Sequence, residues 1–187
     1  MTLDLSKYDN SWYKPGRSFL ICMFWYFINA FFMQNRLNPL SWLKIFLLRI
    51  FGAKIGEGVV LKPSINVKYP WNLEIGDYSW VGENVWLDSL APIRIGSNCC
   101  VSQGVYFCTG SHDWSDPAFG LIIKPIIVED GVWVGAKSIL LPGITLGSHS
   151  IVSAGSVITQ HTDPYIIYAG NPAKMVKQRE ILRKVNL

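Results

Sequence analysis

The apolar positions in the C-terminal half of the chain follow a period of six. Between Val128 and Thr162 an aliphatic residue returns at every sixth position, and a small hydroxyl residue often stands four positions after it. This period is neither the 3.6 of an α-helix nor the alternation of a two-faced strand. It is typical of a hexapeptide β-helix, in which each hexad forms one short strand and then turns a corner. The aliphatic positions are Val128, Val134, Leu140, Leu146, Val152 and Ile158, and the hydroxyl positions are Ser138, Ser150, Ser156 and Thr162.

The same period, less regular, occupies the preceding stretch. Hexads begin at Ile55, resume at Ile75 after a less regular stretch, and resume again at Ile95 after a slip of two residues. Three hexads make one triangular coil, and stacked coils pair their strands in parallel about 4.8 Å apart. Such a solenoid is stabilised by aliphatic side chains that stack from coil to coil in an interior column. We therefore expect a mainly β fold with a parallel β-helix over residues 54–170.

The hexads stop after Phe107 and return only at Val128. The intervening residues read CTGSHDWSDPAFGLIIKP and predict one protruding loop at about 109–126. Insertions in a solenoid become loops on one face, which is often the binding face. This loop concentrates polar and aromatic residues in an otherwise aliphatic region, with His112, Asp113 and Trp114 in succession. This loop is therefore the segment that we expect to contribute catalytic or binding residues.

Residues 1–53 predict an irregular arm followed by two hydrophobic helices. The segment Phe19–Met33 is apolar except for Asn29, and it is too short for a bilayer crossing of roughly 20 residues. A second helix is expected to begin near Ser41 and to end at Gly52, with Lys44 and Arg49 on an exposed polar side. Such a pair could cover the open end of the solenoid or lie on a membrane face. Both interpretations remain open from the sequence.

The last segment, residues 171–187, predicts a turn at Asn171-Pro172 followed by a short basic helix. Five basic residues gather there, and they suit either a local anionic ligand or a solvated helix face. They form no stripe along the solenoid, so a nucleic-acid partner is not expected. They are Lys174, Lys177, Arg179, Arg183 and Lys184.

The composition of the chain bears on its number of domains and on its cellular compartment. The chain has 187 residues, a formal net charge of +4, 50% hydrophobic residues and 16% charged residues, which suits one domain with a substantial core. Its four cysteines form no CxxC pair, which favours a reducing compartment. The N-terminus has neither the cationic segment nor the cleavage pattern of a secretory signal peptide. We expect a cytoplasmic protein, with contact to the inner face of the membrane left open.

The ordered set of motifs resembles a known family. The hexads, TGSHDW, VWVGAKSILLPG, VSAGSVIT and AGNPAKMV together resemble the hexapeptide-repeat O-acetyltransferases over roughly residues 50–180, closest to the branch of colanic-acid and other exopolysaccharide biosynthesis. The resemblance implies a left-handed β-helix, a homotrimer with active sites between subunits, and acetyl-CoA as co-substrate without a metal. It further implies a sugar hydroxyl as acceptor, on an exopolysaccharide or its lipid-linked precursor.

Acetyl transfer to a hydroxyl needs a base, and a neutral imidazole with its ordinary pKa of about 6.5 suits that task. His112 is the only histidine in the insertion, and the resemblance assigns it as general base. Asp113 could orient the imidazole, bind acceptor hydroxyls or simply cap a turn. Asp88 occupies a position that contacts the acceptor in related enzymes, where Asn is frequent, and Trp133 matches an aromatic residue that flanks the site.

The resemblance also places the acetyl-CoA groove. Small residues at coil corners match the positions that meet the pantetheine arm, although any tight corner requires small residues. Two lysines match basic positions that meet the CoA phosphates. The expected cofactor-binding residues are Gly135, Ala136, Ala154, Thr159, Lys174 and Lys177.

Two other functions fit the same solenoid. A metal-dependent hydratase would bring three histidines to one zinc, but His149 and His161 are two hexads apart and fall on different faces of the prism. A non-enzymatic assembly module at the membrane would use the hydrophobic helices for docking and carry GSHDW as an ordinary loop.

Overall fold

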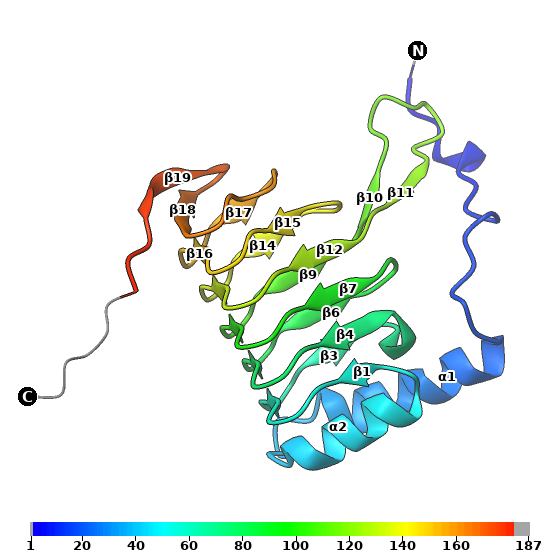
Figure 1. The fold of residues 1–187 in the computed structure, drawn as a ribbon. Coiled ribbons are helices and arrows are strands. Elements are labelled where there is room, and N and C mark those ends of the chain that lie inside the picture. The colour runs from blue at the N-terminus through cyan, green and yellow to red at the C-terminus, as the bar shows by residue number, and fades with distance from the viewer. Residues whose placement is uncertain (1, 182–187) are drawn as a thin grey trace, which may run out of the picture.

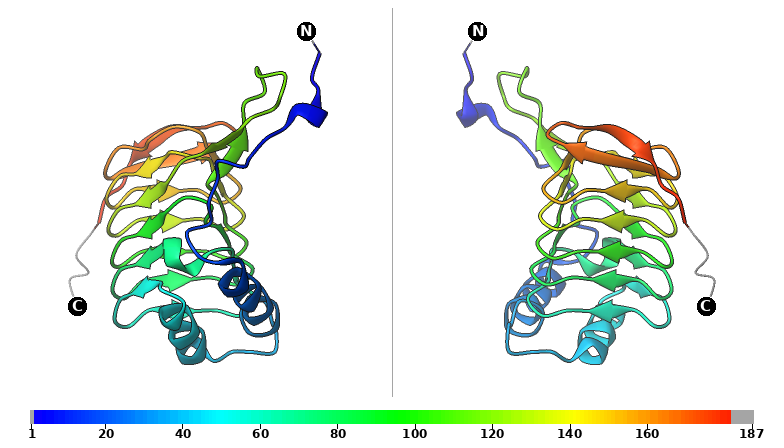
Figure 2. Two further views of the ribbon diagram at one scale, coloured as in Figure 1. Left: turned by 90° about the vertical axis from the view of Figure 1, so that its right-hand side faces the viewer. Right: turned by 90° about the vertical axis from the view of Figure 1, so that its left-hand side faces the viewer.

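The computed structural model describes residues 2–181 and consists of a parallel β-helix with two helical segments at one end (Figure 1). Each coil contributes one short strand to each of three sheets, which form the three sides of a prism (Figure 2). Neighbouring coils pair in register, as in Trp133 with Cys100 and Ile151. The parallel solenoid predicted from the hexads is confirmed.

The strands of the first sheet, sheet A, are β1 (Lys54–Ile55), β4 (Leu73–Ile75), β7 (Ile93–Ile95), β12 (Ile126–Val128) and β15 (Thr145–Leu146). Sheet B contains β2 (Val60–Leu61), β5 (Trp80–Val81), β8 (Cys100–Val101), β13 (Trp133–Val134), β16 (Ile151–Val152), β18 (Ile166–Gly170) and β19 (Ala173–Gln178). Sheet C contains β3 (Asn66–Val67), β6 (Trp86–Asp88), β9 (Tyr106–Cys108), β14 (Ile139–Leu140) and β17 (Val157–Ile158). A 3-10 turn, Pro70–Asn72, precedes β4.

The interior column is built from the aliphatic hexad positions. All six, from Val128 to Ile158, are at most 2% exposed. The hydroxyl positions are buried too and satisfy backbone groups inside the corners: Ser138 Oγ donates to the Ser153 carbonyl oxygen at 3.0 Å. The period of six therefore combines two functions, because one position fills the core and another closes the turn.

The protruding loop is a β-hairpin on the connection from sheet C to sheet A. It consists of β10 (Gly110–His112) and β11 (Leu121–Ile123), which pair antiparallel with His112 opposite Leu121. Figure 1 shows the hairpin extending away from the solenoid. The prediction of one protruding loop at this place is confirmed.

The two N-terminal helices cover the open end of the first coils. They are α1 (Phe19–Ile28), which continues as a π-helical turn, Asn29–Met33, and α2 (Ser41–Ile50). Trp25, Met33 and Leu48 point inward and are at most 1% exposed. Within residues 2–181 none of the helices is both long and apolar enough to cross a membrane.

The expectation that Lys44 lies on an exposed polar side of α2 is wrong. Lys44 is fully buried, and its Nζ donates to the carbonyl oxygen of Leu61 at 3.3 Å. Ser41 does not cap its own helix either, because its Oγ accepts a hydrogen bond from the backbone N–H of Leu61. Both side chains satisfy the backbone of β2 at the end of its sheet, where no further coil supplies partners.

The N-terminal arm runs along the solenoid from α1 to the hairpin (Figure 2). It contains one 3-10 turn, Leu5–Lys7, and is fixed by long-range hydrogen bonds. The Tyr13 hydroxyl donates to the Leu90 carbonyl, and the Asp4 N–H donates to the Pro117 carbonyl at 2.9 Å. The arm therefore lies along the corner between sheets C and A.

The predicted C-terminal basic helix is wrong for the described part of the segment. Residues 173–178 form strand β19, which turns back at Asn171-Pro172 and pairs antiparallel with β18. The hairpin gives β19 backbone partners on the last strand of sheet B, which outweighs the helical preference of a short Lys- and Met-containing segment. Residues 182–187, which include Arg183 and Lys184, lie outside the described residues.

Candidate active site

The imidazole of His112 is held by a hydrogen bond across its own hairpin. Nδ1 lies 2.9 Å from the carbonyl oxygen of Phe119. A carbonyl oxygen can only accept, so Nδ1 carries the proton in the neutral ring and Nε2 keeps its lone pair. The hairpin thus fixes the tautomer that a general base requires.

Two aromatic rings pack on this imidazole. The Phe119 ring stacks on it with centroids 4.4 Å apart and planes 8° apart, and the Tyr8 ring from the N-terminal arm lies 5.6 Å away. His112 itself remains partly exposed. Sequence reasoning did not find Tyr8 or Phe119, and for Tyr8 no local signal exists, because its contact spans more than 100 residues.

The carboxylate of Asp113 belongs to the turn of the hairpin. Its Oδ1 accepts from the backbone N–H of Ser115 at 2.9 Å and from the Ser115 hydroxyl. The hydrogen bond from the Ser115 hydroxyl, and to a smaller extent the one from the Ser115 N–H, lowers the pKa of Asp113 below its usual range. The group that orients the imidazole is therefore the Phe119 carbonyl and not Asp113, while a contact of Asp113 with the acceptor stays a prediction.

Asp88 ends β6 on the same corner as the hairpin. It is 7% exposed, its Oδ1 lies 3.1 Å from Nζ of Lys68, and its Oδ2 accepts from the Tyr106 hydroxyl at 3.4 Å. Burial, followed by an interaction with Cys108, raises the pKa of Tyr106, which keeps the phenol protonated as a donor. A nearly buried carboxylate in this position can accept a hydrogen bond from a sugar hydroxyl.

Four predicted residues line one groove on the corner between sheets B and C. Trp133, Gly135, Ala136 and Ala154 surround a groove of about 480 Å³. A Cβ on Gly135 would lie 2.5 Å from the backbone nitrogen of Ala154, so this position also has a packing reason to be Gly. The groove thus combines a tight coil contact with an accessible backbone.

Ser102 and Gln103 line the same groove and were not predicted. The Ser102 hydroxyl accepts from the indole N–H of Trp133 at 3.0 Å. Because β8 pairs in register with β13, these residues stand one coil below Gly135 and Ala136. Counting one coil back from the predicted corner would have found them.

The three remaining predicted cofactor-binding residues do not line this groove. Thr159 is exposed and follows β17, on the side where sheet C leads toward sheet A. Lys174 and Lys177 are exposed on β19, opposite Ala169 and Ile167 of β18. Their proposed contacts with CoA stay predictions.

Within one chain the predicted base and the predicted groove occupy different corners. The hairpin with His112 lies where sheet C leads to sheet A, and the groove lies where sheet B leads to sheet C. Sheet C separates them. A site that uses both groups therefore needs the groove of another copy of the chain.

The other two histidines have separate partners. His149 stacks on Tyr165 with centroids 4.8 Å apart, and Nδ1 of His161 accepts from the backbone N–H of Thr145 at 2.9 Å. In residues 2–181, no three His, Cys, Asp or Glu side chains are grouped as metal ligands would be. His149 and His161 therefore have local partners of their own, away from the His112 hairpin.

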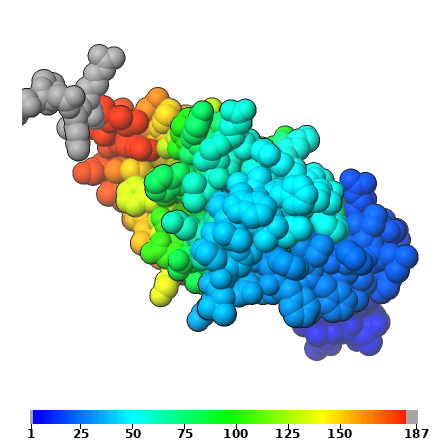
Figure 3. All heavy atoms as spheres, turned by 90° about the horizontal axis from the view of Figure 1, so that it is seen from below, coloured from blue at the N-terminus to red at the C-terminus, as the bar shows by residue number. Residues whose placement is uncertain are grey.

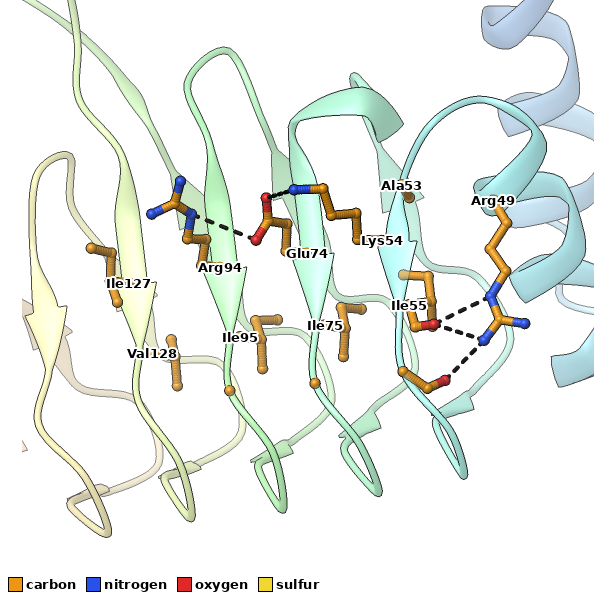
Figure 4. A pocket seen from close by; sticks show the side chains of 13 residues that line it. Arg49, Ala53, Lys54, Ile55, Glu74, Ile75, Arg94, Ile95, Ile127 and Val128 are labelled. Carbon is orange, nitrogen blue, oxygen red and sulfur yellow. Dashed lines mark hydrogen bonds and ion pairs between the residues drawn. The ribbon is translucent and has the colours of Figure 1, made fainter.

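Another hollow, of about 690 Å³, lies on the outer side of sheet A (Figure 4). Three of its charged side chains pair with one another, since Lys54 Nζ lies 2.8 Å from Glu74 and Arg94 lies 3.7 Å from the same carboxylate, whereas Arg49 donates to the backbone carbonyls of Ile55 and Gly56. It contains none of the predicted site residues. Its charges stabilise a ladder across neighbouring coils.

The fold, the hairpin with His112 and the corner groove define a class of β-helix proteins built from hexapeptide repeats, and comparison with known proteins identifies its family. Residues 125–160 match the family model described as hexapeptide repeat of succinyl-transferase. The "Putative colanic acid biosynthesis acetyltransferase WcaF" of Escherichia coli is 35% identical over 167 residues, which cover 89% of this chain and 91% of that protein.

The galactoside O-acetyltransferase of Escherichia coli is 25% identical over 71% of this chain and 66% of its own length. A hexapeptide-repeat acetyltransferase of Vibrio cholerae, solved with acetyl-CoA, superposes with a TM-score of 0.71 at 28% identity and covers 78% of this chain and 81% of its own. The chain belongs to the hexapeptide-repeat acetyltransferases. The left-handed parallel β-helix that the resemblance implied is therefore confirmed.

Proposed function

We propose that the protein transfers an acetyl group from acetyl-CoA to a sugar hydroxyl, with His112 as the general base. The observation that carries the proposal is the hydrogen bond from Nδ1 of His112 to the Phe119 carbonyl, because it leaves Nε2 free to accept a proton. The acetyl-CoA complex of the Vibrio cholerae relative supports the choice of donor.

In this mechanism Nε2 takes the proton of the acceptor hydroxyl while the hydroxyl oxygen bonds to the thioester carbonyl carbon. When the tetrahedral intermediate collapses, the carbon–sulfur bond breaks and the imidazolium returns the proton to the departing sulfur. Asp88, Asp113 and Trp133 are proposed to position the acceptor. Gly135, Ala136, Ala154 and Thr159 are proposed to hold the pantetheine arm, with Lys174 and Lys177 near the phosphates.

The site is proposed to lie between subunits of a homotrimer. Support comes from the chain itself, since its base and its groove sit on different corners of the prism. A cyclic trimer presents the same surface of each subunit to the next one, which brings one hairpin to the neighbouring groove three times.

The acceptor is proposed to be an exopolysaccharide sugar or its lipid-linked precursor. The similarity to the colanic acid biosynthesis relative over nine-tenths of both chains supports this class. We place the reaction in the cytoplasm, where four free thiols are stable and where a lipid-linked acceptor would be met at the inner face of the membrane.

The test follows thiol release from acetyl-CoA with a panel of mono- and oligosaccharide acceptors. We expect His112→Ala to lower the acceptor-dependent rate by roughly 10²- to 10⁴-fold while retaining a thermal shift with CoA. His161→Ala is the matched control, because it removes an imidazole outside the site, and it should keep the rate. Full activity in His112→Ala would refute the assignment, and absence of any CoA shift in folded wild type would favour the assembly module.

A further inference from the structure

The helices that close the solenoid expose an apolar side on the outside of the molecule. Along α1 and its π-helical continuation, Leu20, Phe24, Phe27 and Phe31 recur at helical spacing and are between 51% and 76% exposed. Isolated exposed apolar residues are ordinary, but a contiguous patch of large ones marks an interaction surface. This side of α1 therefore has the character of a surface that binds a partner.

The second helix adds to the same surface. Trp42, Phe46 and Ile50 lie four residues apart on α2 and are between 56% and 65% exposed. We call these three residues and the four of α1 the outer face. Seen from below, both helices form one continuous surface at this end of the molecule (Figure 3). The outer face is thus broad and belongs to two adjacent helices.

Covering the solenoid does not explain the outer face, because the opposite side of each helix does that. Trp25 Nε1 donates to the Val67 carbonyl at 2.8 Å, and Asn29 accepts from the Val67 N–H at 3.1 Å. Ser41 and Lys44 bind Leu61 in the same way on α2. Turning the outer face inward would break all four bonds and leave the end of the first coil unpaired.

The charges around the outer face are predominantly positive, with Glu57, which lines a hollow beside Trp42 and Phe46, as an acidic exception. Residues 10–56 contain six lysines and arginines and neither aspartate nor glutamate. Four of the basic side chains are exposed and flank the helices: Lys14, Arg17, Arg36 and Arg49. A second copy docked on this face would bring cations against cations, whereas anionic lipid headgroups would be attracted.

We propose that the outer face docks on the surface of an anionic lipid bilayer, with α1 and α2 lying in the plane of the headgroups. Aromatic and aliphatic side chains on one side of a helix, with basic residues around them, are the features of interfacial helices. The coils of β1, β4 and β7 then stand between the membrane and the His112 hairpin (Figure 1). A membrane-bound glycan would extend along the solenoid to reach the hairpin.

The test measures co-sedimentation of the full chain with vesicles of phosphatidylcholine alone and of phosphatidylcholine mixed with phosphatidylglycerol. The outer-face variant carries Leu20→Ser, Phe24→Ser and Phe31→Ser. The matched control carries Tyr78→Ser, Trp114→Ser and Met175→Ser, which remove three comparably exposed large residues elsewhere. Circular dichroism confirms folding of each variant, and vesicle binding is read without CoA or acceptor, so its outcome is independent of acetyl transfer.

We expect wild type and control to bind the mixed vesicles more strongly than the neutral ones, and the outer-face variant to lose at least tenfold in partition. Wild type that stays in solution with both vesicles would overturn the proposal. Equal binding by all three proteins would overturn it too. A lipid-free wild type of twice the mass of the outer-face variant would assign the face to a second copy instead.

Discussion

Removing one aliphatic side chain from the interior column is expected to cost far more than the same change on the surface. Leu140 is fully buried and stacks in register between Phe107 and Ile158, which are themselves at most 2% exposed. Neighbours fixed by ladders on both sides cannot collapse into the space left by Leu140→Ala. The loss should therefore be about 3–5 kcal/mol, the upper part of the range for such changes.

For a chain of this size that loss corresponds to a melting temperature lower by roughly 6–20 °C, measured by differential scanning calorimetry. Leu37→Ala is the control, since the same atoms are removed from a residue that is 90% exposed. Its free energy of unfolding should change by less than about 0.5 kcal/mol. Equal losses for the two variants would refute the stacked column as the source of stability.

Three further changes test other parts of the structure. Burial lowers the pKa of Lys44, so wild-type stability should rise as pH increases toward about 10.4; Lys44→Met should remove that rise in pH-dependent denaturation, and it leaves the Leu61 carbonyl without its donor. Gly135→Ala places a Cβ against the backbone of Ala154, so it should lower the free energy of unfolding in urea by about 1–3 kcal/mol and reduce the thermal shift that CoA produces. An unchanged urea midpoint would contradict the close contact between these coils. Tyr8→Ala should lower kcat/KM roughly 2- to 10-fold through the lost ring contact with His112, at unchanged melting temperature.

The repeating part of the fold was predictable because one local rule governs it. A residue such as Val134 repeats the environment of Val128 and Leu140, so its burial follows from position alone. The hairpin was predictable because the six-residue period is interrupted there, between Phe107 and Val128. His112 stood out as the histidine in that interruption, which is local information as well.

The errors arose where the solenoid ends. At its first coil the unpaired carbonyl of Leu61 needs a donor, and this draws Lys44 inward against its usual preference for solvent. At the last coil, β18 offers an edge to which residues 173–178 add as a strand. Contacts such as Tyr8 with His112 join distant segments, and no local pattern in the sequence encodes them.

The central claim is that one subunit's His112 works with the groove of its neighbour, and a mixing experiment tests it most directly. His112→Ala protein and Ala136→Trp protein, whose groove is blocked, are each expected to be inactive in the thiol-release assay with the acceptor that the sugar panel identifies. Unfolding and refolding them together should restore about a quarter of wild-type activity, because random assembly pairs an intact hairpin with an intact groove at that frequency. A mixture as inactive as its components would contradict the shared site.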